Sequence, residues 1–561
     1  MLYTADFETT TDPLDCRVWA YGICDIEDPD KFIHGNNMDD FMAWCEFEGN
    51  NRLYFHNLKF DGEFIISWLF RHGFDHVTED KHMRENTFTT LISDKGQFFT
   101  MKIVFEKGKH RSNYIEFYDS LKILPFSVEK IAKGFNLKIE KQEIDYKAAR
   151  PVGHDLTPEE IQYLQNDCTI LALALRVLFS QSLDRMTQAS NALKDFKETM
   201  PWWTFEKMFP SPEYDEEIRK SYKGGFCYLN PKYKNKNVYS GIVLDVNSLY
   251  PSVMRNKILP FGDGVHYVGR YRPHKAYTLY VQVLRCQFEL KPDMIPTIAT
   301  KSSRVFLPTE YLTDSKGEDV TLTLTSVDME LFFEHYNVFN IEWIDGWKFK
   351  GTIGLFTPYI DKWTNVKIES KIAGNKAMYT LAKLMLNALY GKFALNPNVR
   401  SKIPFVTDGI VHYALGEQEQ REPLYIPVGT YITSWARDTT IRAAQAVYNR
   451  FLYADTDSLH LSGSSVPDGI EISDTELGKW KFEFKFKRAR YLRAKAYMEY
   501  GREPGEKKDY WKIVCAGMPA RCHPFVKWSN FHVGSAYPGQ LKTKHVKGGI
   551  VLLDGEFTLK P

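Results

Sequence analysis

Tyr453-Ala454-Asp455-Thr456-Asp457-Ser458 is the stretch that decides the fold, because apolar, strand-like residues flank it on both sides. Phe451-Leu452 leads in and the alternating Leu459-His460-Leu461 leads out, which predicts a β-hairpin with two carboxylates at its tip. Two aspartates two residues apart on extended backbone would point to the same side, where like charges repel unless a cation lies between them. The pair therefore indicates a hard divalent metal bound through oxygen, and the alternative is an exposed Asp-Thr-Asp turn.

A second pair of carboxylates lies at the amino terminus. Residues 2–8 have the alternation of a β-strand, on which Asp6 and Glu8 share one face while Phe7 turns into a core. Two carboxylates on one such face need a counter-charge, so this strand also indicates a metal. The alternative is a solvated acidic face, on which such pairs are common.

Two helices carry further candidates for the same site. Asp61 precedes an apolar run that predicts a buried helix, and capping of that helix is its alternative role. Residues 157–160 (Thr-Pro-Glu-Glu) form a capping box that opens a helix with Tyr163 and Asp167 on one face. A phenol one turn from a carboxylate could orient a water beside a metal, or simply form a hydrogen-bonded pair.

The middle of the chain holds a strand and a long helix with polar residues at regular spacing. Residues 242–251 contain a short apolar strand that ends in Asp245, and Pro251 stops its continuation. Residues 376–393 predict a helix that presents one polar face, made of Lys383, Asn387 and Tyr390. A cation, an amide and a flat ring in a row fit the phosphate, sugar and base of a nucleotide. The alternative is an amphipathic helix with a decorated outer face.

Composition bounds the class of protein. The chain has 561 residues, 43% of them hydrophobic, which is enough for several packed domains and too long for one. Eight scattered cysteines without a CxxC pair favour reduced core thiols over disulfides or zinc. The sequence shows neither a membrane span nor a signal peptide, so we expect an intracellular, soluble protein.

The charge is unevenly distributed along the chain. The net charge is only +1, yet residues 481–561 hold 17 Lys or Arg against 7 Asp or Glu, a local +10 beside −9 for the remainder. A basic carboxy-terminal part beside acidic sites suggests a track for a phosphate backbone next to metal-binding carboxylates. A solvated basic surface is the alternative.

The first three acidic patterns, taken in order, resemble the exonuclease motifs of proofreading DNA polymerases, which are built on a ribonuclease-H-like fold. The resemblance implies that Asp6, Glu8, Asp61 and Asp167 hold two metals that hydrolyse a phosphodiester, that Tyr163 positions the water and that Lys141 assists. It further implies contacts with a single-stranded primer end. These would come from Thr9, His56, Asn57, Phe60, Ser120 and Leu121.

The later patterns resemble the motifs of family B DNA polymerases. Asp245-Val-Asn-Ser-Leu-Tyr250-Pro251 resembles Dx2SLYP, the helix resembles Kx3NSxYG with Ala388 at the serine position, Asp455-Thr-Asp457 resembles DTD, and Lys495-Ala-Tyr497 resembles KxY. Tyr222-Lys223-Gly224-Gly225 resembles the YxGG segment, which binds template DNA, and adjacent glycines let backbone N–H groups approach a phosphate. Taken alone, the two glycines also fit a plain turn.

The resemblance assigns roles to the residues of these motifs. Asp245, Val246, Asp455 and Asp457 would hold the metals for in-line attack by a 3′-hydroxyl, and Lys495 and Tyr497 would grip the primer. Tyr250 would exclude a 2′-hydroxyl, and the backbone N–H groups of residues 246–249 would meet the triphosphate. The remaining nucleotide contacts would be Leu249, Lys383, Asn387, Tyr390 and either Lys367 or Lys371, a choice that the spacing leaves open.

The matches span residues 6–497, and the intervals between them resemble the insertions of protein-primed family B polymerases of the phi29-type phage group. The implied fold is α/β and multidomain, with a ribonuclease-H-like 3′-5′ exonuclease domain and a palm-fingers-thumb polymerase domain that carries two insertions. The expected parts are exonuclease 1–187, palm 188–260, palm segment and first insertion 261–354, fingers 355–394, second insertion 395–425, palm 426–520 and thumb 521–561.

This resemblance also implies replication of a linear phage genome with intrinsic strand displacement, together with cofactors and partners. We expect two Mg²⁺ ions per active site, with Mn²⁺ as a substitute, and a monomer that uses template-primer DNA, dNTPs and a terminal protein as primer. Single-stranded and double-stranded DNA-binding replication proteins would be further partners, without a membrane, in the cytoplasm of an infected bacterial cell. The alternative is a nucleic-acid-primed family B polymerase. A stand-alone nuclease would not need the second set of carboxylates.

Overall fold

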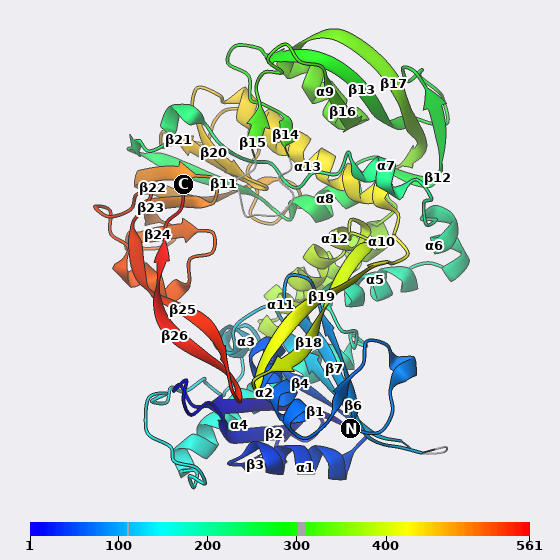
Figure 1. Ribbon diagram of the computed structural model, residues 1–561. Coiled ribbons are helices and arrows are strands. Elements are labelled where there is room, and N and C mark those ends of the chain that lie inside the picture. The colour runs from blue at the N-terminus through cyan, green and yellow to red at the C-terminus, as the bar shows by residue number, and fades with distance from the viewer. Residues whose placement is uncertain (109–111, 301–309) are drawn as a thin grey trace.

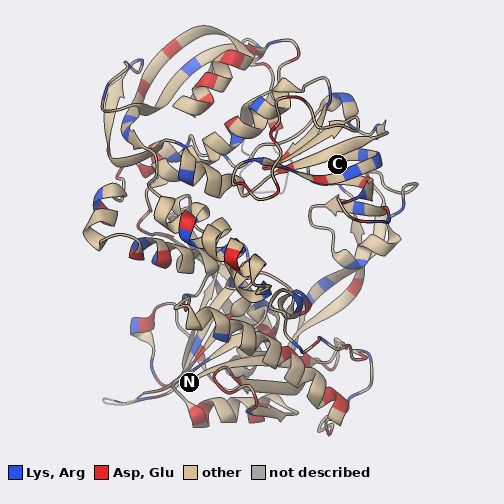
Figure 2. Cartoon of the chain, turned by 180° about the vertical axis from the view of Figure 1, so that it is seen from behind, with Lys and Arg blue, Asp and Glu red and all other residues tan. Residues whose placement is uncertain are grey.

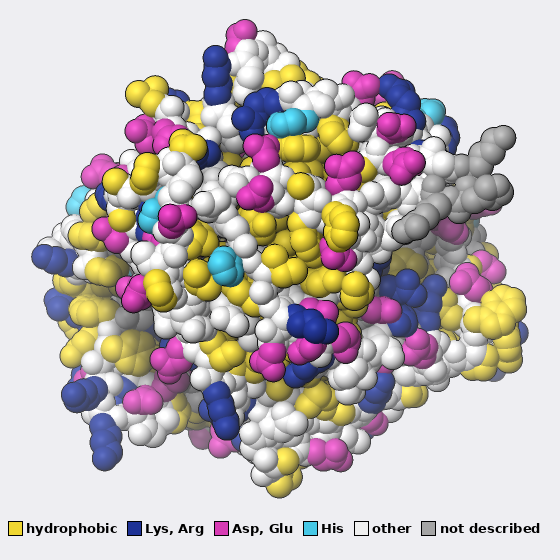
Figure 3. Space-filling model, turned by 90° about the horizontal axis from the view of Figure 1, so that it is seen from below, with side chains coloured by type: hydrophobic (Ala, Val, Ile, Leu, Met, Phe, Trp, Pro, Cys, Tyr) yellow, Lys and Arg dark blue, Asp and Glu magenta, His cyan; other side chains and the backbone are white. Residues whose placement is uncertain are grey.

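The computed structural model describes residues 1–108, 112–300 and 310–561. Its main bodies are an amino-terminal sheet with helices, a second sheet with its own helices and a third, curved sheet, joined by helices and two long hairpins (Figure 1). No helix among the described residues is long and apolar enough to cross a membrane. Seen from below, acidic, basic and hydrophobic side chains are interspersed over the surface (Figure 3).

The amino-terminal sheet has eight strands in the order β3-β2-β1-β4-β8-β7-β6-β5, with β1, β4 and β8 mutually parallel. Its strands are β1 Leu2–Thr9, β2 Val18–Asp25, β3 Phe32–Gly35, β4 Asn51–Phe55, β5 Asp75–His76, β6 Thr87–Ile92, β7 Phe98–Lys107 and β8 Ser112–Asp119. The helices α1 Met38–Glu48, α2 Leu58–Arg71, α3 Val128–Gly134 and α4 Pro158–Ser180 accompany it. The expected capping box opens α4, where the Thr157 side chain accepts from the N–H of Glu160 and the Glu160 carboxylate accepts from that of Thr157.

The polar residues after 187 predict a loose linker by their composition, and this prediction is wrong. They form α5 Gln188–Glu198, α6 Trp202–Met208 and α7 Asp215–Arg219. Phe196 of α5 stacks on Phe356 at 4.7 Å between ring centroids and also meets Phe393, which anchors α5 in the main core. The polar residues form the outer face of an amphipathic helix, which explains why composition alone was misleading.

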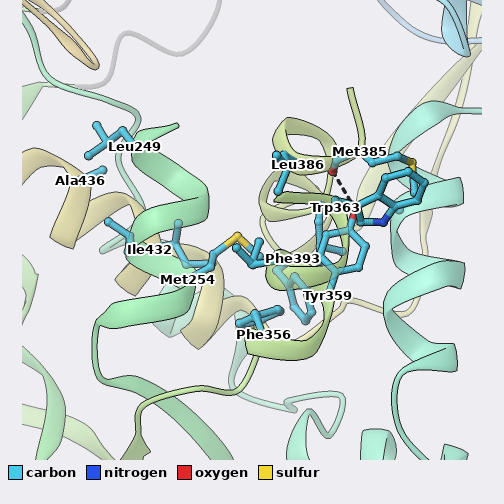
Figure 4. Packing of buried hydrophobic residues seen from close by; sticks show 14 of the residues in the cluster. Leu249, Met254, Phe356, Tyr359, Trp363, Met385, Leu386, Phe393, Ile432 and Ala436 are labelled. Atoms are coloured by element: carbon cyan, nitrogen blue, oxygen red, sulfur yellow. Dashed lines mark hydrogen bonds between the residues drawn. The ribbon is translucent and has the colours of Figure 1, made fainter. Parts of the chain in front are cut away.

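The second sheet carries the decisive hairpin at its centre. Its path is β24-β23-β22-β11-β21-β20-β9, with β10 beside β22. The strands are β9 Cys227–Leu229, β10 Asn237–Val238, β11 Gly241–Val246, β20 Phe451–Asp455, β21 Ser458–Ser462, β22 Trp480–Arg493, β23 Ala496–Arg502 and β24 Tyr510–Cys515. The helices α8 Leu249–Asn256 and α13 Ile426–Ala446 pack on it, and Ile432 and Ala436 of α13 face Leu249 and Met254 of α8 (Figure 4).

Residues 259–352 fold around a four-stranded sheet of order β12-β17-β13-β16. Its strands are β12 Leu259–Val268, β13 Leu279–Leu290, β16 Val320–Thr325 and β17 Tyr336–Thr352, and α9 Ser326–His335 packs against it. The short pair β14 Ile298–Thr300 and β15 Glu310–Leu312 lies nearby. The sheet lies within the expected first insertion, of which residues 301–309 are outside the described residues.

The helix expected over residues 376–393 is two helices. α10 Thr357–Ile372 is followed by α11 Lys376–Ala388 and by the short α12 Tyr390–Phe393. The Tyr359 hydroxyl of α10 donates to the Met385 carbonyl at 2.7 Å, and this bond ties α10 to α11 at the point where the helix ends (Figure 4). Leu389, between α11 and α12, keeps right-handed helical angles of φ −71° and ψ −46°, so the interruption is local and the expected alignment of Lys383, Asn387 and Tyr390 stays a prediction.

Two antiparallel hairpins reach from the upper part of the molecule down to α2 (Figure 1). The first is β18 Asn398–Thr407 with β19 Ile410–Gln420, inside the expected second insertion, and the second is β25 Ala536–Val546 with β26 Gly549–Thr558. Local turn preference predicts a hairpin over residues 546–560 with its turn at Asp554-Gly555. The hairpin forms, but it turns at Lys547 and Gly548, and the predicted turn is wrong because Asp554 and Gly555 pair with β25. All eight cysteines are buried and free, as expected.

Candidate functional site

The first acidic site, Asp6, Glu8, Asp61 and Asp167, is assembled from β1, α2 and α4. The alternation of β1 turns Phe7 into the core and leaves Asp6 and Glu8 on the opposite face, as predicted. α2 begins after Asn57, whose φ is 81°, so Asp61 lies inside the first turn and is only 3% exposed. The capping interpretation of Asp61 is therefore wrong.

Burial and mutual repulsion dominate the electrostatics of this site. Burial and the charge of Asp167 raise the pKa of Asp6 to about 7. Burial, and then the charge of Asp6, raises the pKa of both Glu8 and Asp61 well above the usual range. Four carboxyls held this close need a positive partner to ionise at neutral pH.

Lys141 supplies part of that charge. Its ammonium group pairs with the Asp167 carboxylate, and the hydroxyls of Tyr163 and Tyr146 are 2.9 Å apart above it. One oxygen of Asp61 and one of Asp167 are buried without a hydrogen-bond partner. Among the described residues no three Asp, Glu, His or Cys side chains are already drawn together as a metal-binding group. The oxygen-only donor set, the raised pKa values and the unpartnered oxygens nevertheless fit hard divalent ions.

A cavity of about 690 Å³ opens over these carboxylates. Thr9, His56, Asn57 and Phe60 line it, together with residues 550–554 of β26. Such a cavity has room for the end of a bound polymer strand between the amino-terminal sheet and the carboxy-terminal hairpin.

Ser120 and Leu121 are not among the residues that line this cavity. The Ser120 side chain is fully buried, donates to the Phe55 carbonyl at 2.9 Å and lies 3.0 Å from Nδ1 of His56. The Leu121 N–H donates to the Asp119 carboxylate at 3.0 Å. The Ser120 hydroxyl therefore supports His56 in this structure, and direct contact of Ser120 and Leu121 with a strand stays a prediction.

Without divalent ions we expect Asp6→Asn to melt at a higher temperature than the unsubstituted protein at pH 8. Because the pKa of Asp6 rises from 3.8 to about 7 on folding, the native state binds more protons in that window and stability falls as pH rises through it. Asparagine keeps the shape without the charge, so we expect a gain of a few degrees at pH 8 and a smaller one at pH 5. Thermal unfolding in EDTA measures this, with exposed Asp30→Asn as control, and equal melting temperatures at pH 8 would contradict it.

The second acidic site, Asp245, Asp455 and Asp457, lies where β11 and β21 meet. The hairpin forms as predicted, but its geometry differs from the expectation, because Thr456 and Asp457 are the turn and Thr456 has a φ of 60°. Asp455 and Asp457 therefore do not share a strand face. Asp245 pairs with Ser458 across the sheet, and this register brings the carboxyl of Asp245 beside that of Asp457.

Burial and the charge of Asp457 raise the pKa of Asp245 to about 7, and burial also raises that of Asp457. The ammonium of Lys495 lies 2.8 and 3.0 Å from the two oxygens of Asp455, and the hydroxyl of Tyr453 donates to the same carboxylate. Lys495 of the expected KxY motif therefore neutralises Asp455 in this structure. Tyr497 is buried beneath it and faces Tyr453 at 5.3 Å between ring centroids.

Close packing on this site explains the second glycine of the YxGG segment, Gly225, whereas a Cβ on Gly224 would meet nothing within 4 Å. A Cβ on Gly225 would lie 2.6 Å from the hydroxyl of Thr456 and 3.0 Å from that of Tyr250, so only glycine fits there. Arg437, buried on α13, donates to the carbonyls of Lys223 and Gly224 at 2.8 and 2.9 Å. The segment is thus fixed against the aspartate hairpin.

Two of the backbone N–H groups that follow Asp245 already donate hydrogen bonds within the protein. The N–H of Val246 donates to the Asp457 carbonyl at 2.8 Å, and that of Asn247 donates to the Lys479 carbonyl at 2.9 Å. The expectation that the N–H of Val246 meets a triphosphate is therefore wrong for this structure, because the hydrogen bond that fixes the hairpin uses it. Ser248 and Leu249, at the start of α8, remain candidates.

Aromatic and basic side chains face the second site from α8, α10, α11 and α12. The rings of Tyr250 and Tyr390 stack with centroids 3.9 Å apart, which joins the Dx2SLYP and helix motifs despite the break in the helix. Lys367 is half-buried, and burial together with the charges of Lys383 and Lys371 lowers its pKa. This group of cations has the charge to receive a triphosphate. Lys371 and Asn387 are exposed on α10 and α11.

Several residues of these sites escaped the sequence analysis. Tyr146 pairs with Tyr163, 17 positions later, and Arg437 pairs with Lys223, 214 positions earlier. In the sequence each is a single tyrosine or arginine outside any recognised motif. Glu483 and Lys512, which form an ion pair of 3.3 Å, line the pocket of about 410 Å³ around the second acidic site. Glu483 lies within the basic residues 481–561, and an acidic side chain in that basic part of the sequence was the feature that could have identified it. The basic residues of that run lie along β22 and the carboxy-terminal hairpin (Figure 2).

Comparison with known proteins gives concordant results. Residues 47–475 match the family described as DNA polymerase type B, organellar and viral. The DNA polymerases of Bacillus phage B103 and Bacillus phage phi29 are each 47% identical over 577 residues, which cover 100% of this chain and 99% of the relative. That of Streptococcus phage Cp-1 is 31% identical over 586 residues, covering 100% of this chain and 98% of the relative.

Solved structures agree over the full length. Phi29 DNA polymerase in complex with primer-template DNA and incoming nucleotide substrates is similar at a TM-score of 0.94 and 46% identity, with 100% of both chains covered. An orthorhombic crystal form of the same enzyme gives a TM-score of 0.96 at 45% identity, again with 100% of both chains covered. The expected fold class is confirmed by these matches.

Proposed function

This chain belongs to the type B DNA polymerases of the phi29 phage group and is a DNA-directed DNA polymerase, and we propose that its two acidic sites divide synthesis and proofreading between them. The second acidic site would add nucleotides to a primer. The first would remove them from a single-stranded 3′ end. The observation that carries the proposal is that two separate carboxylate sites, each with raised pKa values, lie under cavities of their own.

In the proofreading site, Asp6, Glu8, Asp61 and Asp167 would hold two Mg²⁺ ions, with Mn²⁺ able to replace them. Such ions lower the pKa of a bound water and stabilise a leaving 3′ oxygen. The chain's own contribution is orientation: the hydroxyl of Tyr163 lies 2.9 Å from that of Tyr146, and Lys141 is paired with Asp167. Thr9, Asn57 and Phe60 line the cavity in which the strand would lie.

In the polymerising site, Asp245 and Asp457 would hold two further Mg²⁺ ions, helped by the backbone of Val246, with Asp455 beside them. The cations of Lys383 and Lys367 would bind the triphosphate, because Lys367 is the half-buried member that faces Lys383 while Lys371 is exposed. The stacked ring of Tyr250 would lie under the sugar and leave no room for a 2′-hydroxyl.

The remaining DNA contacts follow from the same geometry. Lys495 would exchange its pairing with Asp455 for the primer backbone once metal neutralises the carboxylates. The segment of Tyr222, Gly224 and Gly225, fixed by Arg437, would hold the template. We assign the functional parts as in the sequence analysis, with residues 188–198 packed on the fingers helices.

The partners would be template-primer DNA, dNTPs and a terminal protein whose hydroxyl serves as primer, with single-stranded and double-stranded DNA-binding replication proteins alongside. The relatives that are 31–47% identical to this chain are phage proteins, so the setting would be the cytoplasm of an infected bacterium, with the polymerase as a monomer. A nucleic-acid-primed enzyme is the second candidate. Transfer of a labelled nucleotide onto a protein, stable to heat and detergent, would distinguish the two.

Primer extension through a blocking strand tests the proposed function. We expect the protein with Mg²⁺ and dNTPs to extend a primer on a template that carries a hybridised downstream strand, and to reach the template end without a helicase. A template without the downstream strand is the control for synthesis itself. Products that stop at the first hybridised nucleotide would contradict strand displacement, and no product on either template would contradict the polymerase assignment of the second site.

A further inference from the structure

A fully buried carboxylate follows the KxY segment in the second sheet. Glu499 of β23 and His460 of β21 are 0% and 1% exposed, and Nδ1 of His460 lies 2.7 Å from Oε1 of Glu499. The hydroxyl of Tyr491 on β22 donates to the same oxygen at 2.7 Å. Oε2 of Glu499 is buried without a hydrogen-bond partner among the described residues. These three side chains form the Glu499 cluster.

The Glu499 cluster connects strands that are not neighbours. β22 and β11 lie between β23 and β21 in the second sheet. In a flat sheet, strands three places apart would be separated by about 14 Å, which is beyond the combined reach of a glutamate and a histidine side chain. The sheet is therefore curled at this point, and the contact between Glu499 and His460 closes it over the two strands between them. This contact fixes how β23 lies relative to the strand that follows the aspartate hairpin.

The ring of Tyr497, in the KxY segment, packs on the Glu499 cluster. Alternation along β23 places Tyr497 and Glu499 on one face, while Met498 belongs to a different core cluster on the other face. The ring centroid of Tyr497 lies 5.1 Å from that of His460 and 5.5 Å from that of Tyr491. Tyr497 and His460 both line the pocket of the second acidic site. The cluster therefore determines where this ring stands in the pocket.

Lys495, the other KxY side chain, is fixed through the same strands. Its backbone N–H donates to the hydroxyl of Tyr453 at 2.9 Å, and that hydroxyl donates to the Asp455 carboxylate at 3.2 Å. The ring of Tyr453 in turn packs on that of His460, with centroids 5.1 Å apart. A shift of β23 against β21 would therefore move both KxY side chains relative to the aspartates.

Glu499 keeps its charge despite its burial. Burial alone would raise the pKa of Glu499, but the His460 ring and the Tyr491 hydroxyl outweigh this effect and lower the pKa below its ordinary value. A fully buried carboxylate with one oxygen unsatisfied is costly, and an apolar side chain could fill the same space. Stability alone therefore does not explain a glutamate at this position.

We propose that Glu499 is a positioning residue for the primer end. Through His460 and Tyr491 it sets the KxY side chains against the aspartate hairpin, which keeps the primer end in the second acidic site. This rests on the proposed function. A primer end held less firmly there would spend more time in the first acidic site, where it is degraded. Glu499 thus acts on the balance between synthesis and degradation, and not on the chemistry of either step.

The dNTP concentration at which extension of a paired primer balances its degradation tests this proposal. A general loss of active protein does not move this balance, because it reduces both activities together. In Glu499→Leu we expect the balancing concentration to rise about tenfold, which corresponds to about 1.4 kcal/mol, while degradation of a single strand keeps its rate. Unchanged balance in Glu499→Leu would overturn the proposal.

Matched variants identify the interaction that is responsible. Glu499→Gln keeps an oxygen that accepts from His460 and Tyr491, so it should restore most of the balance. His460→Phe keeps a ring without Nδ1 and should resemble Glu499→Leu. Glu506→Leu removes an exposed glutamate from the turn after β23 and should behave as the unsubstituted protein. Equal balance in Glu499→Gln and Glu499→Leu would overturn the proposal, because the hydrogen bonds would then not matter.

A triple variant separates positioning from stability. His460→Phe, Tyr491→Phe and Glu499→Leu together remove all three polar partners, and replacing a buried ion pair by apolar side chains is often neutral or stabilising. We expect this variant to melt no lower than Glu499→Leu and still to need about tenfold more dNTP than the unsubstituted protein. A normal balance in the triple variant would overturn the proposal, because apolar packing would then suffice. Absence of primer extension by the unsubstituted protein would overturn the proposed function instead.

Discussion

Asp457→Ala is expected to abolish primer extension while leaving degradation of single-stranded DNA intact. Asp457 lies in the hairpin turn, and its carboxyl is the charged neighbour that contributes most to raising the pKa of Asp245. Its removal leaves Asp245 without the second carboxylate that a pair of metal ions requires. Loss of a metal that stabilises transition-state charge is worth several kcal/mol, so we expect extension to slow roughly 10³-fold or more.

The structure provides a matched control for Asp457→Ala. Asp468→Ala removes an aspartate from the exposed loop that follows β21, and it should extend primers at the normal rate. Primer extension and single-strand degradation are measured on the same preparations with Mg²⁺. Extension by Asp457→Ala at a rate close to that of Asp468→Ala would contradict the polymerising role of the hairpin, and loss of both activities would contradict the separation of the sites.

The hairpin and its neighbours also mark where sequence reasoning succeeds. Alternation of apolar residues predicted β1 and β21, because side chains on a strand follow a strict period of two, and a run of apolar, strand-like residues predicted β20. The capping box predicted the first turn of α4 from purely local hydrogen bonds. These signals come from residues that are neighbours in the sequence. The predictions based on them therefore do not depend on tertiary contacts.

The errors arose where contacts distant in the chain decide the outcome. The period-two argument failed at Asp457, since pairing of β20 with β21 left Thr456 and Asp457 as the turn. The helix over residues 376–393 broke after Ala388, near the point where α10 holds the Met385 carbonyl. The carboxy-terminal turn was placed at Asp554-Gly555 by local turn preference, but pairing with β25 moved it to Lys547 and Gly548.

The candidate site shows the same division. The acidic residues of both sites stood out in sequence because each motif is short and local. Tyr146 did not, since it looks ordinary in its own segment and its hydroxyl meets that of Tyr163 only in the folded chain. Arg437 was missed for the same reason, as its partners Lys223 and Gly224 lie more than two hundred positions earlier.

Asp61→Ala is expected to give the opposite phenotype to Asp457→Ala, namely normal primer extension with single-strand degradation reduced roughly 10³-fold or more. Asp61 is 3% exposed and has an oxygen without a hydrogen-bond partner, so its carboxylate is placed to hold a cation and does not serve as a structural cap. Because burial and the charge of Asp6 already penalise ionised Asp61, removing it relieves repulsion and should not unfold the protein.

The measurement for Asp61→Ala is degradation of a labelled single strand, alongside extension of a correctly paired and a mismatched primer. Glu46→Ala, on the exposed face of α1, is the matched control. A mismatched primer end should persist in the products of Asp61→Ala and be removed by Glu46→Ala, since proofreading needs the first acidic site and synthesis does not. Rapid degradation by Asp61→Ala would mean that Asp6, Glu8 and Asp167 suffice, and the assignment of Asp61 as a metal ligand would then be wrong.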